Sequence, residues 1–330
     1  MHEQLQMEHL GSFAGRTFGS LISRRAWLQV SAGAAGLSLG ICNRAFGSEQ
    51  SQLKGYRIGI YTRPWDSFDY RVALDAAAEA GFRYVGLMTT TLPGRRLVIT
   101  PDISPEEASA IGEEVRKRGL AVTSVYSDFS LAEGLEKAVA SLKRLIDNCR
   151  IAGASSLLLG GVGNPKVYEL YYATIKACCD YAAERAIAMT IKPHGGLNAT
   201  GPQCRQAIER VGHPNFSLWY DPGNIFYYSD GKLDPVDDAG TVDGLVREGM
   251  CIKDFVMSEE HGKIRKDVWV TPGKGRVNFL AVLRRLRDGG FVKGDLVIEC
   301  IDRPDPRDTD NLLSEAKLAR QFVEDLLAQL

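Results

Sequence analysis

The sequence predicts a (β/α)8 barrel, the TIM-barrel form of the α/β class, and three observations favour this fold. After residue 47, eight short segments rich in Val, Ile, Leu and Tyr alternate with segments that carry helix signals. No linker divides these residues into two halves. The turn after the first predicted strand, residues 60–64, lacks the glycines with which an open nucleotide-binding sheet cradles phosphates. We therefore expect one closed barrel over residues 48–330 rather than an open doubly wound sheet.

The predicted strands are short, and their near-continuous apolar character suits strands that are covered on both faces. In chain order they are Tyr56–Tyr61, Tyr84–Met88, Ala121–Tyr126, Ser155–Leu159, Met189–Ile191, Phe216–Tyr220, Met250–Ile252 and Leu296–Ile301. A long loop is expected after the seventh strand, with His261 solvated in it.

Helix signals stand between these strands. Ser104–Glu107 combines an N-cap serine, a proline at the first helical position and a reciprocal glutamate, and Ser130–Glu133 repeats the capping box. Asn164–Pro165 starts another helix, and Asn311–Leu330 reads as a final amphipathic one. Glycines that suit left-handed helix ends precede the second, third and fourth strands, at Gly81, Gly119 and Gly153.

The composition is that of an ordinary globular protein. The 330 residues are 45% hydrophobic and 25% charged, which argues against intrinsic disorder. No apolar run reaches the ~20 residues that a membrane-spanning helix needs. Forty basic and forty-one acidic residues leave a formal charge of -1, and this balance gives no support for the basic surface that the phosphates of a nucleic acid need. We expect no nucleic-acid partner.

Residues 1–47 have the layout of an export signal. A paired arginine, Arg24–Arg25, precedes a modest apolar stretch, and the small residues of Ala45–Gly47 indicate cleavage before Ser48. The pair, followed after one residue by Trp and Leu, resembles the twin-arginine signal of bacteria. We therefore predict the twin-arginine export machinery as a partner and a periplasmic or otherwise exported location. The alternatives are a disordered basic N-terminus and a short membrane anchor.

Without residues 1–47 the chain has 36 basic and 39 acidic residues, a formal charge of -3, and six cysteines. An even number permits disulfides in an oxidising compartment. A chain of this length is stable through its core, however, and the neighbours Cys178 and Cys179 cannot pair without strain. We predict no disulfide framework.

Polar residues at the ends of the last four predicted strands indicate where the chemistry lies, because a barrel carries its site at the carboxyl ends of its strands. These residues are Lys192, His194, Asp221, Lys253 and Glu299. Cations mixed with carboxylates suit the stabilisation or movement of negative charge on a polar substrate.

Four motifs in this region resemble the sugar phosphate isomerase/epimerase family, the xylose isomerase-like TIM barrels. They are Asp221–Asn224, Lys253–Phe255, Pro272–Phe279 and Ile298–Glu299, and the resemblance covers about residues 55–330. It implies a divalent cation held by glutamate, aspartate, histidine and glutamate on strands five to eight. It also implies that the two glutamates exchange a proton with the carbon next to a carbonyl, while the metal steadies the enediolate.

The sequence departs from this pattern at two of the four metal-ligand positions. Asp221 and Glu299 match the family, whereas Lys192 and Cys251 stand where the first glutamate and the histidine are expected. In one hypothesis the Lys192 ammonium replaces part of the metal's charge, or Lys192 is neutral enough to act as a base. In the other, His194, Asp221, Cys251 and Glu299 bind a divalent metal such as Mn, Mg, Zn or Co.

We therefore assign the chemistry to Lys192, Asp221 and Glu299. Side chains at strand ends that suit sugar rings and oxyanions are expected to bind the substrate: Arg63, Trp65, His194, Trp219, Asn224 and Lys253. A glycine-rich turn, Gly160–Gly163, suits either a phosphate or a tight turn.

The function expected from these residues is that of a sugar isomerase or epimerase that removes a proton next to a carbonyl. The alternatives are a sugar lyase or dehydratase on the same barrel, and a barrel that binds a carbohydrate without catalysis. A nucleic-acid repair enzyme on this fold would need a cluster of histidines on several zinc ions. After residue 47 the chain has only three: His194, His213 and His261.

Overall fold

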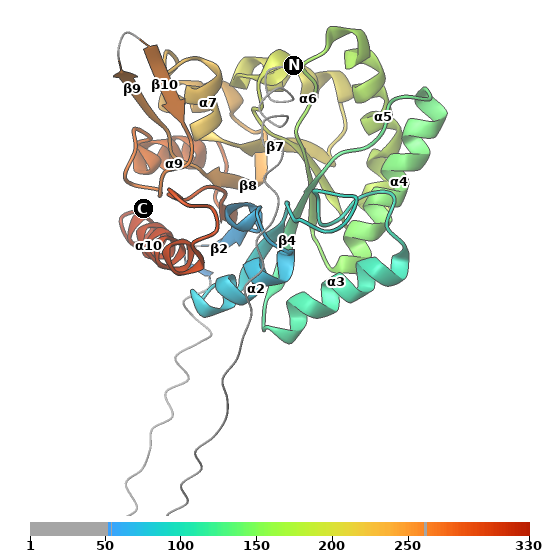
Figure 1. Ribbon diagram of the computed structural model, residues 1–330. Helices are drawn as coiled ribbons and strands as arrows, with labels where there is room; N and C mark the ends of the chain where they lie inside the picture. The colour runs from blue at the N-terminus through green and yellow to red at the C-terminus, as the bar shows by residue number, and fades with distance from the viewer. Residues whose placement is uncertain (1–51, 54, 261–262) are drawn as a thin grey trace, which may run out of the picture. The chain divides into compact units, whose positions relative to one another are not determined.

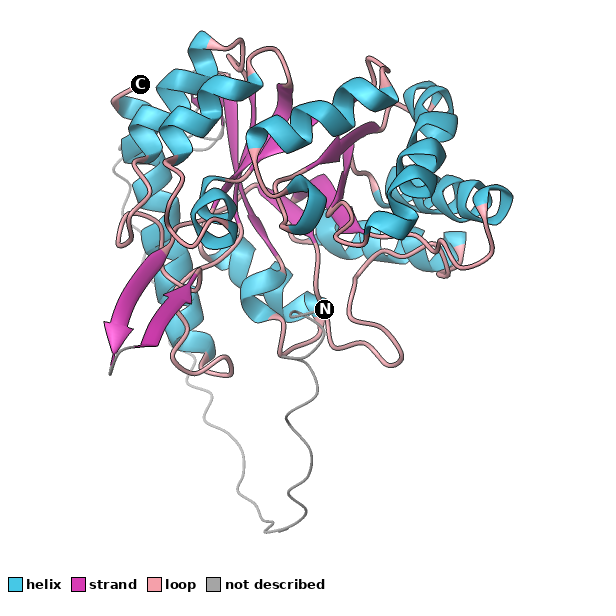
Figure 2. Ribbon diagram, turned by 90° about the horizontal axis from the view of Figure 1, so that it is seen from above, coloured by secondary structure: helices cyan, strands magenta, loops and turns pink. Residues whose placement is uncertain are grey.

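The computed structural model describes residues 52–53, 55–260 and 263–330. Eight parallel strands form a closed ring, in which each strand pairs with the next along the chain and the last pairs with the first (Figures 1 and 2). They are β2 (Tyr56–Tyr61), β3 (Tyr84–Leu87), β4 (Ala121–Ser127), β5 (Ser156–Leu159), β6 (Ala188–Ile191), β7 (Phe216–Tyr220), β8 (Val246–Ile252) and β11 (Gly294–Ile298). The predicted (β/α)8 barrel is therefore confirmed. The predicted export signal, residues 1–47, lies outside the described residues.

Helices connect these strands and surround the ring (Figure 2). They are α2 (Tyr70–Glu79), α3 (Pro105–Lys117), α4 (Leu135–Ala152), α5 (Pro165–Glu184), α6 (Gly201–Val211), α7 (Pro222–Tyr228), α8 (Pro235–Ala239), α9 (Phe279–Asp288) and α10 (Thr309–Ala328). Three 3-10 turns, η1 (Arg63–Trp65), η2 (Gly196–Asn198) and η3 (Gly240–Val242), lie in the connections.

The local signals explain most helix ends. The Ser104 hydroxyl caps α3 by accepting the Glu107 backbone N–H at 3.2 Å. The three glycines expected at left-handed helix ends all have positive φ: Gly81, Gly119 and Gly153. The capping box at Ser130 is a wrong prediction. Its hydroxyl accepts the Ala132 N–H in a local turn, and α4 begins at Leu135, after the N-cap residue Gly134.

Two pairings were not predicted. The loop after β8 contains an antiparallel hairpin, β9 (Val256–Glu260) and β10 (Lys263–Asp267), which extends from the barrel in Figures 1 and 2. A two-residue strand, β1 (Gln52–Leu53), pairs antiparallel with β2. His261, which we expected to be solvated, lies outside the described residues.

The inside of the barrel is filled by side chains, as is usual for this fold. A cluster separate from the main core comprises Tyr61, Met88, Leu158, Trp219, Cys251 and Val297, each at most 5% exposed. The largest member, Trp219, lies against Gly249 of β8. A Cβ atom at Gly249 would come within 2.5 Å of the indole, so this close approach requires glycine.

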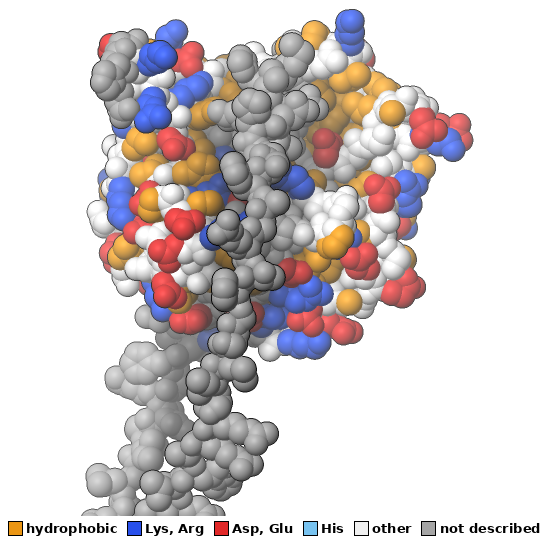
Figure 3. Space-filling model, in the orientation of Figure 1, with side chains coloured by type: hydrophobic (Ala, Val, Ile, Leu, Met, Phe, Trp, Pro, Cys, Tyr) orange, Lys and Arg blue, Asp and Glu red, His pale blue; other side chains and the backbone are white. Residues whose placement is uncertain are grey.

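The described surface is polar and mixed in charge. Figure 3 shows Lys and Arg interspersed with Asp and Glu over the described part of one face. The six cysteines after residue 47 are all buried and free. Among the described helices, none combines the length and the apolar character needed to cross a bilayer.

Candidate active site

Four charged side chains predicted from the strand ends meet at the carboxyl end of the barrel. They follow β6, β7, β8 and β11 directly, so the ring closure brings them together from distant parts of the chain. All are at most 1% exposed: Lys192, Asp221, Lys253 and Glu299. We call these four residues and Arg63 the charge cluster.

Two ammonium groups bridge the two carboxylates of the charge cluster. Lys192 Nζ lies 2.7 Å from Glu299 Oε2 and 3.3 Å from Asp221 Oδ2. Lys253 Nζ lies 2.7 Å from Glu299 Oε1 and 3.1 Å from the same Asp221 Oδ2. Charge-assisted hydrogen bonds of this length hold all four groups in one geometry.

Neighbouring polar groups complete the hydrogen bonding of the carboxylates. The Asp221 Oδ1 atom caps α7 by accepting the Asn224 backbone N–H at 3.0 Å, and the Asn224 Oδ1 atom accepts a hydrogen bond from Lys253. Asn224 also donates from Nδ2 to the Pro193 carbonyl at 2.6 Å. Asn224 therefore positions Lys253 from within the site.

Glu299 has two further partners. Arg63 donates from Nη1 to Glu299 Oε1, and Cys251 donates from Sγ to Glu299 Oε2 at 3.0 Å. The sequence suggested Arg63 only as a sugar contact, so its pairing with Glu299 is new. Of the three cations of the cluster, Arg63 is the one that solvent reaches, with 21% of its side chain exposed.

The electrostatics of the cluster fix the ionised forms of Lys192 and Glu299. Burial opposes the positive charge on Lys192 and would lower its pKa. The electrostatic attraction of Glu299, Cys251 and Asp221 is larger, and it raises the pKa of Lys192 well above its ordinary value. Burial likewise opposes the charge on Glu299, yet the adjacent lysines and Arg63 hold its pKa well below its ordinary value. Together with the two ion pairs of Lys192, these directions favour the hypothesis of an ammonium ion at Lys192 over that of a neutral base.

His194 lies beside the cluster, on the partly exposed side. Its ring centroid is 6.2 Å from that of Tyr126 and 5.8 Å from that of Tyr228. Burial, together with Lys192 and Lys253, lowers the pKa of His194 well below its ordinary value, so the imidazole is neutral. A neutral imidazole offers one donor and one acceptor to a substrate.

The two tryptophans expected to stack on a sugar are buried. Trp65, in η1, is 1% exposed and belongs to the core between strands and helices. Trp219 is 0% exposed and fills the barrel interior. Neither ring presents a face to solvent in this structure, so neither can stack on a sugar here.

A third tryptophan, missed by the sequence reasoning, lies near the cluster. Trp269 follows the β9–β10 hairpin and is partly exposed. The guanidinium carbon of Arg63 lies 5.2 Å from the centroid of its ring, and that of Arg303 lies 3.2 Å away. Arg303 in turn donates two hydrogen bonds to Asp66, at 2.5 and 3.1 Å.

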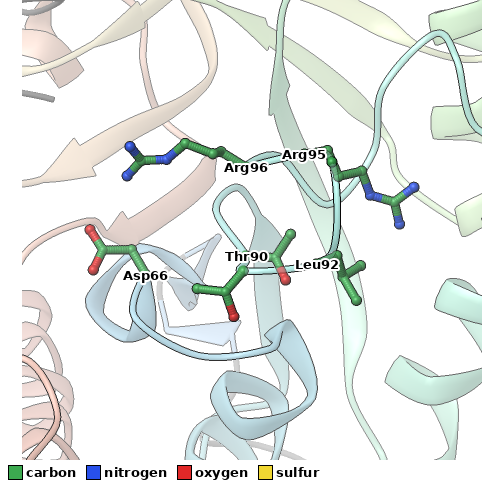
Figure 4. Close-up of a pocket in the computed structure, with 7 residues that line it drawn as sticks. Asp66, Thr90, Leu92, Arg95 and Arg96 are labelled. Carbon is green, nitrogen blue, oxygen red and sulfur yellow. The ribbon is translucent and has the colours of Figure 1, made fainter. Parts of the chain in front are cut away.

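Asp66 marks the edge of a neighbouring cavity of about 490 Å³ (Figure 4). Thr90, Leu92, Arg95 and Arg96 line it, and Figure 4 shows the two arginine side chains pointing in opposite directions. Arg95 pairs with Glu107 on α3 at 2.5 Å. The lining is therefore polar and held partly by its own ion pairs.

The glycine-rich turn after β5 is explained by packing. A Cβ atom at Gly196 would come within 2.3 Å of Gly163, and one at Gly161 would overlap the Asn198 side chain. The following helix, α5, is capped by Asn164, which accepts the Lys166 N–H at 3.0 Å. Close approach of two turns accounts for these glycines without a phosphate.

The cluster contains three potential metal ligands that lie close together. Ligand atoms of Asp221, Cys251 and Glu299 lie within 4.8 Å of one another, and among the described residues His194 is not part of this group. The carboxylate oxygens that face one another already accept hydrogen bonds from Lys192 and Lys253. A divalent ion there would displace or strongly repel two ammonium groups. The donor set therefore does not fit a divalent cation while both lysines are in place.

Fold and site together define a (β/α)8 barrel with a buried polar centre at the carboxyl ends of its strands. The chain belongs to the xylose isomerase-like TIM barrel family, whose sequence profile matches residues 74–322. A comparison with curated protein sequences gives no match.

Solved structures share this fold at low sequence identity. A xylose isomerase domain protein from Planctomyces limnophilus is 22% identical, with a TM-score of 0.62, and the match covers 82% of this chain and 97% of that protein. D-psicose 3-epimerase from Clostridium cellulolyticum H10, solved with D-tagatose, is 16% identical with a TM-score of 0.61, over 82% and 99% of the two chains. A xylose isomerase-like TIM barrel protein from Mycobacterium smegmatis, solved with magnesium, is 17% identical with a TM-score of 0.62, over 80% and 88%.

Proposed function

We propose that this protein is a carbohydrate isomerase or epimerase that removes a proton next to a carbonyl, with two lysine ammonium groups stabilising the resulting negative charge. The observation that carries the proposal is the bridging of Asp221 and Glu299 by Lys192 and Lys253 at the carboxyl end of the barrel. Family membership supports the enzyme class, and the likeness to a sugar epimerase supports a carbohydrate substrate.

In the proposed reaction a carbonyl oxygen of the substrate accepts a hydrogen bond from Lys192 or Lys253. Removal of the neighbouring proton moves negative charge onto that oxygen, where a fixed ammonium group stabilises it in surroundings with little water. The neutral His194 supplies a further hydrogen bond at the partly exposed side.

Glu299 is the proposed base. Its Oε1 atom also bonds to Arg63, the cation that solvent reaches, so this oxygen faces the accessible side of the cluster. The lysines make Glu299 a weaker base, but they also lower the energy of the enolate. The second effect matters more, because a C–H bond next to a carbonyl is still only weakly acidic. In an isomerase one carboxylate moves the proton between adjacent carbons on one face, and the proton of the neighbouring hydroxyl group passes to the former carbonyl oxygen. An epimerase needs a second group, which would be Asp221.

The test follows loss of the substrate C–H signal in deuterated water by NMR, with aldoses and ketoses as substrates. Glu299→Gln should slow exchange by at least about 100-fold, the usual contribution of a general base. Glu315→Gln is the matched control, because Glu315 is a partly buried carboxylate on α10 that pairs with Lys274 and has no residue of the charge cluster among its hydrogen-bond and ion-pair partners within the described part of the chain. Equal exchange rates in the wild type and Glu299→Gln would show that the base is assigned wrongly.

Addition of EDTA separates this mechanism from a metal-dependent one. The exchange rate should be unchanged after EDTA treatment, because the ammonium groups supply the positive charge. Loss of exchange with EDTA, restored by Mn²⁺, Mg²⁺, Zn²⁺ or Co²⁺, would contradict the proposal.

Export through the twin-arginine machinery is a separate part of the proposal and rests on the sequence of residues 1–47. Fusion of these residues to a reporter protein should carry the reporter into the periplasm of a bacterium. Replacement of Arg24 and Arg25 by lysine should retain it in the cytoplasm. Export of the doubly substituted fusion would contradict a twin-arginine route.

A further inference from the structure

The charge cluster has one more cation than it has carboxylates. Lys192, Lys253 and Arg63 face Asp221 and Glu299, which leaves a formal charge of +1 in a largely buried site. Buried charges are normally paired, because an uncompensated one is costly to remove from water.

The carboxylate that follows Lys253 in the sequence does not supply the missing negative charge. Asp254 follows Lys253 in the sequence, but its two oxygens accept four backbone N–H groups, at 2.8–3.0 Å. These donors are Phe255, Gly273, Gly275 and Val277. Asp254 therefore organises the loop before α9 and has no cation of the cluster among its hydrogen-bond partners in the described residues.

The second guanidinium beside the site is already neutralised. Arg303 lies over Trp269 and pairs with Asp66 through two hydrogen bonds. Within the described residues, Arg63 has one carboxylate partner, Glu299, which it shares with both lysines. The excess positive charge is therefore reachable from solvent at Arg63.

We infer that the substrate carries an oxyanion, a carboxylate or a phosphate, which binds Arg63 at the partly exposed side of the charge cluster. This inference rests on the proposed function and names the class of sugar derivative that the site accepts. A guanidinium binds such a group through two parallel hydrogen bonds, and Arg63 can turn one edge to the ligand while the other stays on Glu299. Trp269, which packs against Arg63, limits the directions in which the guanidinium can move.

The test compares matched sugars for binding to the full chain by calorimetry and thermal shift. The panel contains hexoses, the corresponding hexuronates and the corresponding hexose 6-phosphates. At least one anionic set should bind about tenfold or more tightly than the neutral hexoses, and the preference should decrease as salt increases. The uronate and phosphate arms tell the two oxyanions apart.

Arg63→Gln should reduce the preference for the anionic sugar to less than about threefold, and Arg63→Lys should restore part of it. Arg57→Gln is the matched control and should keep the full preference. Arg57 lies on β2, the strand that precedes Arg63, and it also pairs with a buried carboxylate, that of Asp295. This pair lies at the opposite end of the barrel from the charge cluster. Its side chain is 32% exposed, similar to the 21% of Arg63.

Equal binding of neutral and anionic sugars, absence of binding by both anionic sets, or an undiminished preference in Arg63→Gln would overturn the inference. Proton exchange separates this failure from failure of the proposed function. Exchange with neutral sugars alone would refute the oxyanion while leaving the proposed reaction intact. Arg63-dependent binding of an anionic sugar without any exchange would refute the proposed reaction instead.

Discussion

Replacement of Lys192 by methionine tests whether the charge cluster is a single electrostatic unit. Methionine keeps an unbranched side chain, so the change removes a charge with little loss of packing. Lys192 Nζ lies 2.7 Å from Glu299 and 3.3 Å from Asp221, and all three side chains are at most 1% exposed. Two carboxylates would lose a partner that water cannot replace.

Loss of one partner from a buried ion pair typically costs about 3–5 kcal/mol. Because Lys253 remains bonded to both carboxylates, we expect the lower end of this range, about 3 kcal/mol. Lys266→Met is the matched control. Lys266 lies 2.7 Å from Asp230, but these side chains are 30% and 57% exposed, so its loss should cost less than about 1 kcal/mol.

The assay is urea unfolding followed by tryptophan fluorescence, with EDTA present so that no metal binds the vacated position. The double variant Lys192→Met, Glu299→Gln should cost less than the sum of its two single variants, with a coupling of about 1 kcal/mol or more. A cost for Lys192→Met no greater than that of the control would refute the reasoning, because the cluster would then not hold its charges by mutual pairing.

The ligand positions, the Gly249 contact and the buried Asp295 each set a further measurable property of the protein. The double variant Lys192→Glu, Cys251→His rebuilds the ligand pattern that the family resemblance implies, and it should gain stability on addition of Mn²⁺ or Mg²⁺ in a thermal-shift assay. The wild type should not respond. A response of the wild type would show that its donor set binds a divalent cation despite the two lysines. Gly249→Ala should lower the free energy of unfolding by about 1–3 kcal/mol, because the new Cβ atom would overlap the Trp219 ring, and an unchanged urea midpoint would contradict this. Burial raises the pKa of Asp295 to about 6, above its value in the unfolded chain. The folded protein therefore binds this proton more tightly than the unfolded chain does. The resulting contribution to the free energy of unfolding is fully present below about pH 4 and is lost as pH rises through 6. Relative to Asp295→Asn, the wild type should therefore lose about 3 kcal/mol between pH 4 and pH 7; parallel stability curves for the two proteins would show that this carboxyl group does not titrate as described.

The sequence predicted the eight barrel strands because each is a short apolar run bounded by helix signals. Helix starts were less secure. Ser130 has the residue spacing of a cap, but its hydroxyl bonds to Ala132, and the left-handed Gly134 sets the true start of α4. Several local hydrogen bonds compete for one serine, and the sequence does not rank them.

The site residues were found by their positions at strand ends, but their partners were not. Lys192 and Glu299 are 107 residues apart, and only closure of the ring brings them to 2.7 Å. The alternation of side chains along a strand indicates that Trp219 is not a substrate contact. Because side chains alternate along a strand, the inward placement of Asp221 also places Trp219 inside the barrel.

The alternation is lost within a few residues of the end of a strand, and this explains His194. The β6 strand ends at Ile191, and the chain turns into η2 soon afterwards. His194 therefore lies beside the cluster rather than among its ligand atoms. No sequence pattern placed Trp269 near the site, because it follows a hairpin that the apolar runs and helix caps did not predict.

The Trp219 ring and its neighbours close the barrel beneath the charge cluster, since every member of that interior group is at most 5% exposed. Among the described residues this interior group leaves no second exit through the barrel, so a substrate of the proposed reaction would leave by the route through which it entered. In the proposed reaction, a new substrate could therefore enter only after the product has left. A tight product would slow every turnover, and an inhibitor lodged at Arg63 would compete with all substrates equally.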